Sequence, residues 1–165
     1  VADEGIMGGA HLVGALGSSP FDYEGVATQP RIVVKDGVVE SYLLDSYAGR
    51  RLGMASTGHA SGTHNLIIET GAQNLEQLLS TMGSGVLITE LMGMGVNILT
   101  GDYSRGIAGF WVENGEIRHP VEEITAAGNL REMFLGIQAI GNDVDMRSGI
   151  RTGSVLIDHM TIAGE

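Results

Sequence analysis

Short apolar runs bounded by turn residues dominate the chain and predict β-strands. A β-hairpin is predicted where Asp36-Gly37 separates the runs RIVVK and VVESYLL, because Asp-Gly supplies the positive φ angles of a type I′ turn. A second hairpin is predicted at Asn114-Gly115, between IAGFWVE and EIRHPVEEIT. Further strands are expected at the apolar runs NLIIE, VLITEL, VNILT, SVLI and MTIA.

Three segments carry helical signals instead. The first runs from Asp45 to Leu52 and ends at Gly53, a residue type suited to a left-handed C-cap. The second begins at Asn74, an N-cap residue type, and its apolar positions follow the spacing of a core-facing helix, namely Leu75, Leu78, Leu79 and Met82. The third begins at Asn129, and its predicted apolar face consists of Leu130, Met133, Phe134 and Ile137.

The order of these elements predicts an α+β fold with largely antiparallel sheets and about three helices. The Gly-rich residues 1–30 are predicted to be loop, and residues 1–165 have the length of one domain. Each predicted hairpin precedes a helix, and Val34–Val39 resembles Val112–Ile117. Internal duplication of a hairpin–helix unit is one interpretation of this similarity, and chance recurrence of common turn chemistry is the other.

Charge and composition exclude several classes of function. The net charge is −11, from 20 acidic and 9 basic residues, and the sequence has no basic stripe, so we expect no nucleic-acid partner. No apolar run approaches the ~18 residues of a membrane span, and the start lacks the pattern of a secretory signal, so we expect a cytoplasmic protein without membrane contact. The absence of cysteine excludes disulfides and thiolate metal ligands within this chain.

Two histidines lie in the glycine-rich stretch MASTGHASGTHN and are the first candidates for a metal site. His59 and His64 are five residues apart with Gly62 between them, which fits neither a helical pair nor alternate positions on a strand. The zinc-binding helix pattern HExxH is missing from the sequence. Hydrogen bonding of both side chains to loop backbone is therefore favoured over metal binding.

A dense polar cluster follows a predicted strand and is the strongest candidate for a functional site in the sequence. It consists of Asp102, Tyr103, Ser104 and Arg105. A turn closed by an Asp–Arg ion pair is one interpretation of the cluster. A hydrolytic site using Ser104 is the other, although the GxSxG pattern of a nucleophile elbow is missing from the sequence.

The loops of this chain resemble the C-terminal domain of the TldD/PmbA peptidase family, in its TldE (PmbA) branch. The matching strings, in the family's order, are SSPFDYEGVATQ, SYLLDSYAGRRLGM, STGHASGTHN, TELMGMGVN, GDYSRGIAGFWVENGEI, PVEEIT, AGNL, IGNDVDMRSGI and TIAGE. They extend from roughly residue 11 to the end of the sequence. The resemblance implies that the chain is a fragment from which the family's N-terminal domain is absent.

The resemblance also implies a role. In TldD–TldE assemblies, which cleave unfolded peptides, TldD holds zinc through an HExxxH helix and a downstream Cys, and TldE lacks these ligands. This chain has Thr152 at the position of that Cys, in the run SGIRTGSV. We therefore expect a non-catalytic, metal-free partner subunit without a cofactor of its own, with zinc in a TldD-like catalytic subunit.

If this subunit presents an unfolded peptide to its partner, the two polar segments are the expected contacts. The substrate-binding candidates are Thr57, His59, His64, Asp102, Tyr103, Ser104 and Arg105. Two alternatives remain open. One is a peptide-binding or assembly module without a proteolytic role, acting through an exposed sheet edge. The other is a stand-alone hydrolase that uses residues 102–105.

Overall fold

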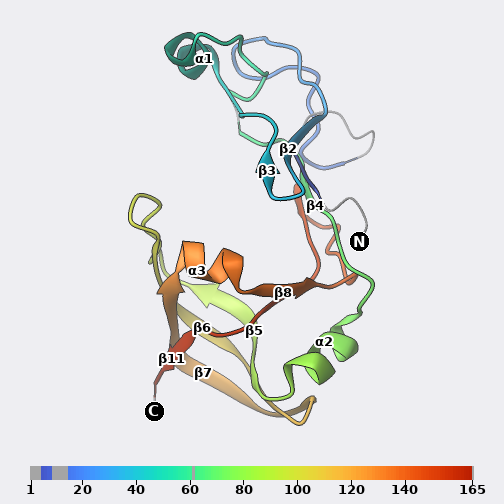
Figure 1. Ribbon diagram of the computed structural model, residues 1–165, viewed down its shortest axis with the longest axis vertical. Coiled ribbons are helices and arrows are strands. Elements are labelled where there is room, and N and C mark those ends of the chain that lie inside the picture. The colour runs from blue at the N-terminus through green and yellow to red at the C-terminus, as the bar shows by residue number, and fades with distance from the viewer. Residues whose placement is uncertain (1–4, 9–14, 61, 165) are drawn as a thin grey trace. The chain divides into compact units, whose positions relative to one another are not determined.

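The computed structural model describes residues 5–8, 15–60 and 62–164. The chain forms two compact units, one of Val1–Thr70 with Asp143–Gly153 and one of Gly71–Asn142 with Ser154–Glu165 (Figure 1). The described residues contain three helices and mostly antiparallel sheets, which confirms the predicted α+β class. The expectation of a single domain stays a prediction.

The first unit is built on a five-stranded sheet with the order β3-β2-β1-β4-β9. Its strands are β1 (Gly5–Gly8), β2 (Arg31–Lys35), β3 (Val38–Val39), β4 (Leu66–Ile68) and β9 (Ile150–Arg151). Only the β4–β9 pair in this sheet is parallel. The first predicted hairpin is confirmed, with φ angles of 50° at Asp36 and 75° at Gly37. The loop predicted for residues 1–30 is wrong at β1, where a short strand pairs with both β2 and β4.

Helix α1 (Ser46–Leu52) has the boundaries that its sequence predicts. The Asp45 carboxylate caps its first turn by accepting a hydrogen bond from the Ala48 N–H at 2.6 Å. Gly53 ends the helix in the left-handed conformation, with φ 68°. Leu44, just before the cap, is buried with 4% of its surface exposed, so the entry to the helix belongs to the core of this unit.

The second unit contains a four-stranded sheet with the order β11-β7-β6-β5 and a two-stranded sheet, β10-β8. The strands are β5 (Gly85–Met92), β6 (Asp102–Glu113), β7 (Glu116–Asn129), β8 (Ile137–Ile140), β10 (Val155–Ile157) and β11 (Thr161–Ala163). The second predicted hairpin is confirmed as β6–β7, joined at Asn114-Gly115. Ile107, Val112 and Ala126 on these two strands are fully buried and form the centre of the core.

Helix α2 (Leu75–Met82) also follows its sequence pattern. Asn74 and Gln77 form a capping box, in which each side chain accepts a hydrogen bond from the backbone of the other at 2.9 Å. Leu78 and Leu79 are buried, as the apolar spacing predicts.

No helix among the described residues has the length and hydropathy that a membrane span requires.

Two predictions for the second unit are wrong. Helix α3 (Leu130–Leu135) begins after Asn129 as expected, but it ends before Ile137, which starts β8, and Phe134 is 70% exposed rather than core-facing. The run VNILT is not a strand, because the Asn97 side chain accepts hydrogen bonds from the backbone of the next residues and closes a turn. The two hairpins lie in different sheets, and their duplication stays a prediction.

Candidate functional site

A buried carboxylate, Asp22, holds the loop that carries His59 and His64. Asp22 is 2% exposed and accepts hydrogen bonds from the N–H groups of Ala60, Glu24 and Val26 at 2.9–3.0 Å. Burial by itself would raise the pKa of Asp22, but these three donors and the nearby His64 bring it below its ordinary value. The sequence interpretation missed this anchor, although an Asp between Pro20 and Gly25 is typical of a side-chain-capped turn.

Thr57 and His59 form a buried chain of hydrogen bonds that starts at the backbone of Leu44. The Thr57 hydroxyl accepts from the Leu44 N–H at 2.7 Å and donates to the Leu44 carbonyl at 3.2 Å. Its oxygen also lies 2.9 Å from His59 Nδ1, so the hydroxyl links the backbone of Leu44 to the imidazole ring. On the other side of the ring, His59 Nε2 is buried without a hydrogen-bond partner among the described residues.

His59 is uncharged near neutral pH. Its side chain is almost fully buried, with 6% of the residue exposed. This burial, together with the positive charges of His64 and Arg31, lowers the pKa of His59 below the ordinary histidine value. A hydrogen bond with the backbone of Thr57 opposes this shift, and the Thr57 hydroxyl lies beside the same ring.

His64 makes the backbone contact that the sequence predicts. Its Nε2 lies 3.2 Å from the carbonyl of Gly58, and its ring centroid is 5.8 Å from that of His59. The residue has a φ of 55°, and its carbonyl is so close to Gly17 that a Cβ there would collide with it. The two histidines are thus neighbours in a tightly packed loop.

An open cavity of about 590 Å³ lies beside this loop in the first unit. Its lining consists of Gly17, Ser19, Phe21, Asp22, Tyr23, Gly62, Thr63 and His64. Of the predicted contacts in this loop, His64 lines the cavity, whereas Thr57 and His59 are buried behind the loop surface. Among the residues that the structure describes, no three His, Cys, Asp or Glu side chains are grouped closely enough to hold a metal ion.

Thr152 and His64 lie at opposite ends of the parallel strand pair β4–β9. Leu66 of β4 pairs with Ile150 of β9. His64 lies two residues before Leu66, whereas Thr152 lies two residues after Ile150. The Thr152 hydroxyl donates to the adjacent Gly153 carbonyl at 3.1 Å, and a neutral hydroxyl is not among the usual protein ligands of zinc. The described residues therefore do not fit a zinc site.

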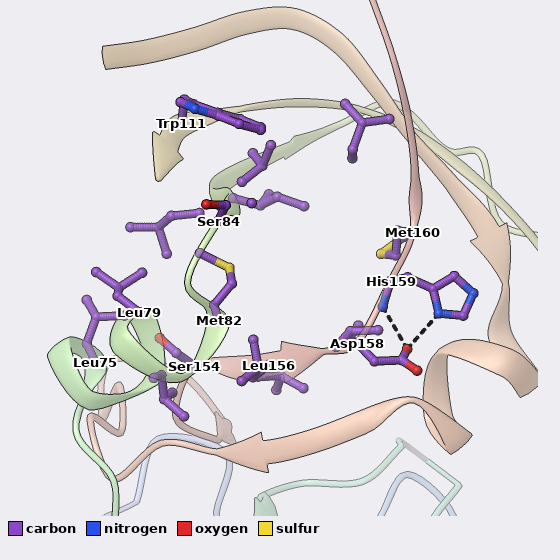
Figure 2. Close-up of a pocket in the computed structure, with 18 residues that line it drawn as sticks. Leu75, Leu79, Met82, Ser84, Trp111, Ser154, Leu156, Asp158, His159 and Met160 are labelled. Carbon is purple, nitrogen blue, oxygen red and sulfur yellow. Dashed lines mark hydrogen bonds and ion pairs between the residues drawn. The ribbon is translucent and has the colours of Figure 1, made fainter. Parts of the chain in front are cut away.

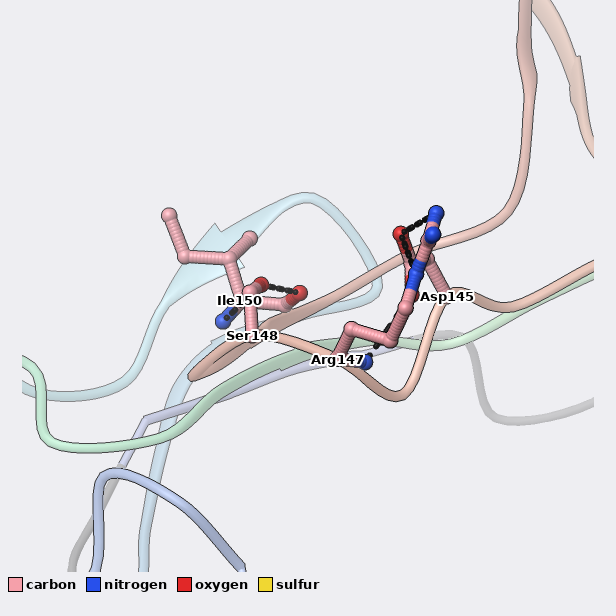
Figure 3. Close-up of polar contacts among 4 residues, drawn as sticks. All are labelled: Asp145, Arg147, Ser148 and Ile150. Atoms are coloured by element: carbon pink, nitrogen blue, oxygen red, sulfur yellow. Dashed lines mark hydrogen bonds and ion pairs between the residues drawn. The ribbon is translucent and has the colours of Figure 1, made fainter.

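The segment before Thr152 is stabilised by local polar contacts (Figure 3). The Asp145 carboxylate accepts hydrogen bonds from the backbone N–H and the guanidinium of Arg147, at 2.8–3.2 Å. These contacts lower the pKa of Asp145 to about 2 and raise that of Arg147. Ser148 bonds to both backbone groups of Ile150. Asp145, whose backbone N–H contacts the Thr152 carbonyl, thus has a carboxylate that is already paired with Arg147.

The polar cluster at residues 102–105 is the beginning of β6. The interpretation as an ion-paired turn is wrong, because Arg105 donates to the carbonyls of Leu91 and Met92 at 3.2 and 3.3 Å. Along a strand, Asp102 and Ser104 point to one face and Tyr103 and Arg105 to the other. The four side chains therefore do not converge on one point.

A second cavity, of about 430 Å³, lies entirely within the second unit (Figure 2). Apolar side chains from α2, β5 and β10 line most of it, and Trp111 lies across the cavity from Asp158 and His159. The Asp158 carboxylate is 3.0 Å from His159 Nδ1. The sequence interpretation missed this cavity, since it assigned the apolar stripe of α2 to a closed core.

The comparison with known proteins identifies the family. Residues 5–164 match the family described as PmbA/TldA metallopeptidase C-terminal domain. The chain belongs to this family. It is 56% identical over 155 residues to metalloprotease PmbA of Escherichia coli O157:H7, covering 94% of this chain and 34% of that protein. The chain thus spans about a third of the length of the curated relatives it matches.

Solved structures share the fold of this chain. A crystal structure from Thermotoga maritima MSB8 is 36% identical, with a TM-score of 0.87, and covers 98% of this chain and 39% of that one. The crystal structure of TldE from Thermococcus kodakarensis is 22% identical, with a TM-score of 0.81, covering 98% of this chain and 40% of that one. The resemblance first seen in the loop motifs is therefore confirmed.

Proposed function

We propose that this chain is part of a non-catalytic, metal-free subunit that completes a TldD–TldE-type zinc peptidase acting on unfolded peptides. The observation that carries the proposal is Thr152. It occupies the position that the family resemblance assigns to a zinc-binding Cys, and its hydroxyl donates to the carbonyl of Gly153. Zinc and the chemistry of peptide cleavage belong to a TldD-like catalytic partner in a cytoplasmic heterodimer.

The substrate contacts are proposed at the two segments that the sequence singles out. His64 lines the open cavity of the first unit, while Thr57 and His59 are buried and position the loop from behind. In the second segment, Asp102 and Ser104 are exposed. Loops with small side chains expose their backbone, and backbone-directed recognition tolerates many peptide sequences.

The two alternatives differ in their support. A stand-alone hydrolase at residues 102–105 is disfavoured, because Ser104 and Arg105 point to opposite faces of β6 and Arg105 is bonded to backbone carbonyls. A peptide-binding module without a proteolytic role is favoured by strands at the ends of sheets, such as β5, which has only β6 as a neighbour among the described strands. This alternative predicts that the protein binds unfolded peptide but does not change the activity of a peptidase partner.

Metal analysis of the full-length protein that contains this chain tests the metal-free assignment. We expect far less than one zinc per chain after purification with zinc in excess, both for the unsubstituted protein and for the double variant His59→Ala/His64→Ala. One zinc per chain that disappears in the double variant would overturn the proposal.

A further inference from the structure

Helix α1 carries a basic surface in an otherwise acidic chain. Although the net charge is −11, residues 46–68 contain neither Asp nor Glu. Arg50 and Arg51 are consecutive in the last turn of α1, and both are exposed. An anionic partner that approaches the chain is therefore repelled by most of its surface and attracted by these two arginines.

Neither of the two guanidinium groups is neutralised by a carboxylate among the residues that the structure describes. Two carboxylates do contact α1, but they bind at its first turn. Asp45 accepts a hydrogen bond from the Ala48 N–H at 2.6 Å. Glu24 accepts one from the Ser46 N–H at 2.8 Å. The positive charge at the last turn is therefore available to a ligand.

Compensation of the helix dipole explains only part of this arrangement. Basic side chains in the last turn of a helix stabilise the partial negative charge of its carbonyl groups. In α1 the carbonyls of Gly49 and Arg50 already accept hydrogen bonds from the Gly53 N–H. Arg51 turns back along the helix instead, and its Nη1 donates to the Tyr47 hydroxyl at 3.1 Å. The guanidinium of Arg51 is thus held in place while most of its five N–H donors stay available.

Exposed apolar groups accompany the two arginines. The exposed fractions are 62% for Tyr47, 56% for Leu52 and 48% for Met54. Arginine, tyrosine and methionine are all enriched where proteins bind their partners. Guanidinium groups next to apolar side chains suit a peptide segment that carries both acidic and apolar residues.

Hydrogen bonds join this basic surface to the open cavity of the same unit. Tyr23 lines the cavity, and the next residue, Glu24, binds the Ser46 N–H at the start of α1. Leu44, just before the helix, binds the hydroxyl of Thr57 in the candidate site loop. The start of α1 is therefore in direct contact with both segments that form the proposed substrate site of the first unit.

The charge of the whole chain favours a peptide over a nucleic acid as the anionic ligand. A nucleic acid places a phosphate at every nucleotide and binds through many basic contacts. Two arginines supply few such contacts, and the remaining acidic surface repels the rest of a long polyanion. A peptide with a few clustered carboxylates meets the arginines without extending its charge over the acidic surface.

We propose that Arg50 and Arg51 bind acidic segments of unfolded peptides and so give the subunit a preference for acidic substrates. The contacts are charge-assisted hydrogen bonds from the guanidinium N–H groups to peptide carboxylates, with Tyr47 orienting Arg51. This inference rests on the proposed function, because it names the class of peptide that the subunit binds.

Fluorescence anisotropy of two labelled, unstructured peptides with the full-length protein that contains this chain tests the preference. One peptide carries Asp and Glu at several positions, and the other has Asn and Gln at the same positions. We expect the acidic peptide to bind about fivefold more tightly at low salt, and its advantage to shrink as the salt concentration rises.

Charge-matched variants locate the contact. The advantage of the acidic peptide should disappear in Arg50→Gln/Arg51→Gln. It should persist in the control Arg118→Gln/Arg131→Gln, which removes the same charge from exposed positions of the second unit. Equal thermal midpoints of the two variants will show that the loss does not come from unfolding.

The outcomes separate this inference from the proposed function. Equal affinity for both peptides in the unsubstituted protein would overturn the inference and leave the proposed function standing, whereas binding of neither peptide would count against both. An advantage that survives in Arg50→Gln/Arg51→Gln would overturn the inference. Tighter binding of a single-stranded RNA than of the acidic peptide would also overturn it, as would weaker assembly of this variant with the catalytic subunit at an unchanged peptide preference.

Discussion

The guanidinium of Arg105 donates a hydrogen bond to the main-chain carbonyl of Leu91, with Nη2 and the oxygen 3.2 Å apart. The bond spans 14 residues of sequence and joins the start of β6 to the end of β5. A second bond, from Nε to the Met92 carbonyl, fixes the angle of the guanidinium. Arg105 is thus a structural residue of the loop that follows β5.

Replacing Arg105 tests this role. In Arg105→Gln the two carbonyls lose their donor, and we expect the free energy of unfolding to fall by about 1 kcal/mol. Hydrogen exchange at the amides of Leu99 and Thr100 should become faster, because their cap at Asn97 loses its support. The control is Arg118→Gln, which removes a surface arginine paired with Glu113 and Glu116 and should change the stability by less than about 0.5 kcal/mol. An unchanged rate of amide hydrogen exchange in Arg105→Gln would show that the loop keeps its conformation without the hydrogen bonds of Arg105.

The hydroxyl group of Thr57 is predicted to contribute more to the stability of the fold than the volume of the side chain does. Thr57→Val keeps the shape but leaves the buried N–H of Leu44 without its acceptor and Nδ1 of His59 without its hydroxyl partner. We expect a loss of about 1–3 kcal/mol in the free energy of unfolding. Thr57→Ser keeps the hydroxyl and should retain most of the stability. Equal denaturation midpoints for the Val and Ser variants would contradict the hydrogen-bond account.

His59 makes stability depend on pH in a defined direction. Its folded-state pKa lies below the ordinary value of 6.5, so the unfolded chain takes up the proton first as the pH falls. The contribution of His59 is therefore complete above pH 6.5 and is lost as the pH falls from there through the folded-state pKa. Imidazole resonances followed by NMR should place the His59 titration below 6.5. Arg31→Gln should raise this pKa by removing a positive charge, whereas Arg50→Gln should leave it unchanged.

Asp145 should titrate far below an ordinary aspartate. Its pKa of about 2 results first from the side-chain and backbone hydrogen bonds of Arg147. Because the folded-state pKa is lowered from 3.8, the stabilisation is present above pH 3.8 and is lost as the pH falls toward 2. The carboxyl resonance of Asp145 should stay constant down to about pH 3, and in Arg147→Gln it should titrate closer to 3.8. A normal titration in the unsubstituted protein would show that the pair does not persist in solution.

The parts of the fold that the sequence predicts correctly depend on local chemistry. Asp36-Gly37 and Asn114-Gly115 form hairpin turns because their positive φ angles are a property of those residues. Asn74 caps α2 because its partner Gln77 is only three residues away. Each of these signals is complete within a few positions of the chain.

The parts that sequence reasoning missed depend on partners far along the chain. Asp22 anchors Ala60 from 38 residues away, so neither residue signals the contact in its own segment. The run VNILT has the composition of a strand, but Asn97 and the close approach of Gly95 to Ser104 make it a rigid loop. The polar residues 102–105 are evident in the sequence, whereas the hydrogen bonds of Arg105 with the end of β5 required the structure.

Our central proposal is that the protein containing this chain supplies no catalytic zinc and acts only with a TldD-like partner. The most direct measurement is the cleavage rate of an unstructured fluorogenic peptide by the full-length protein that contains this chain, by the catalytic subunit, and by their equimolar mixture. We expect no cleavage by the full-length protein alone and a strong increase for the mixture over the catalytic subunit. Chelator-sensitive cleavage by the full-length protein alone, or equal rates with and without it in the mixture, would contradict the account.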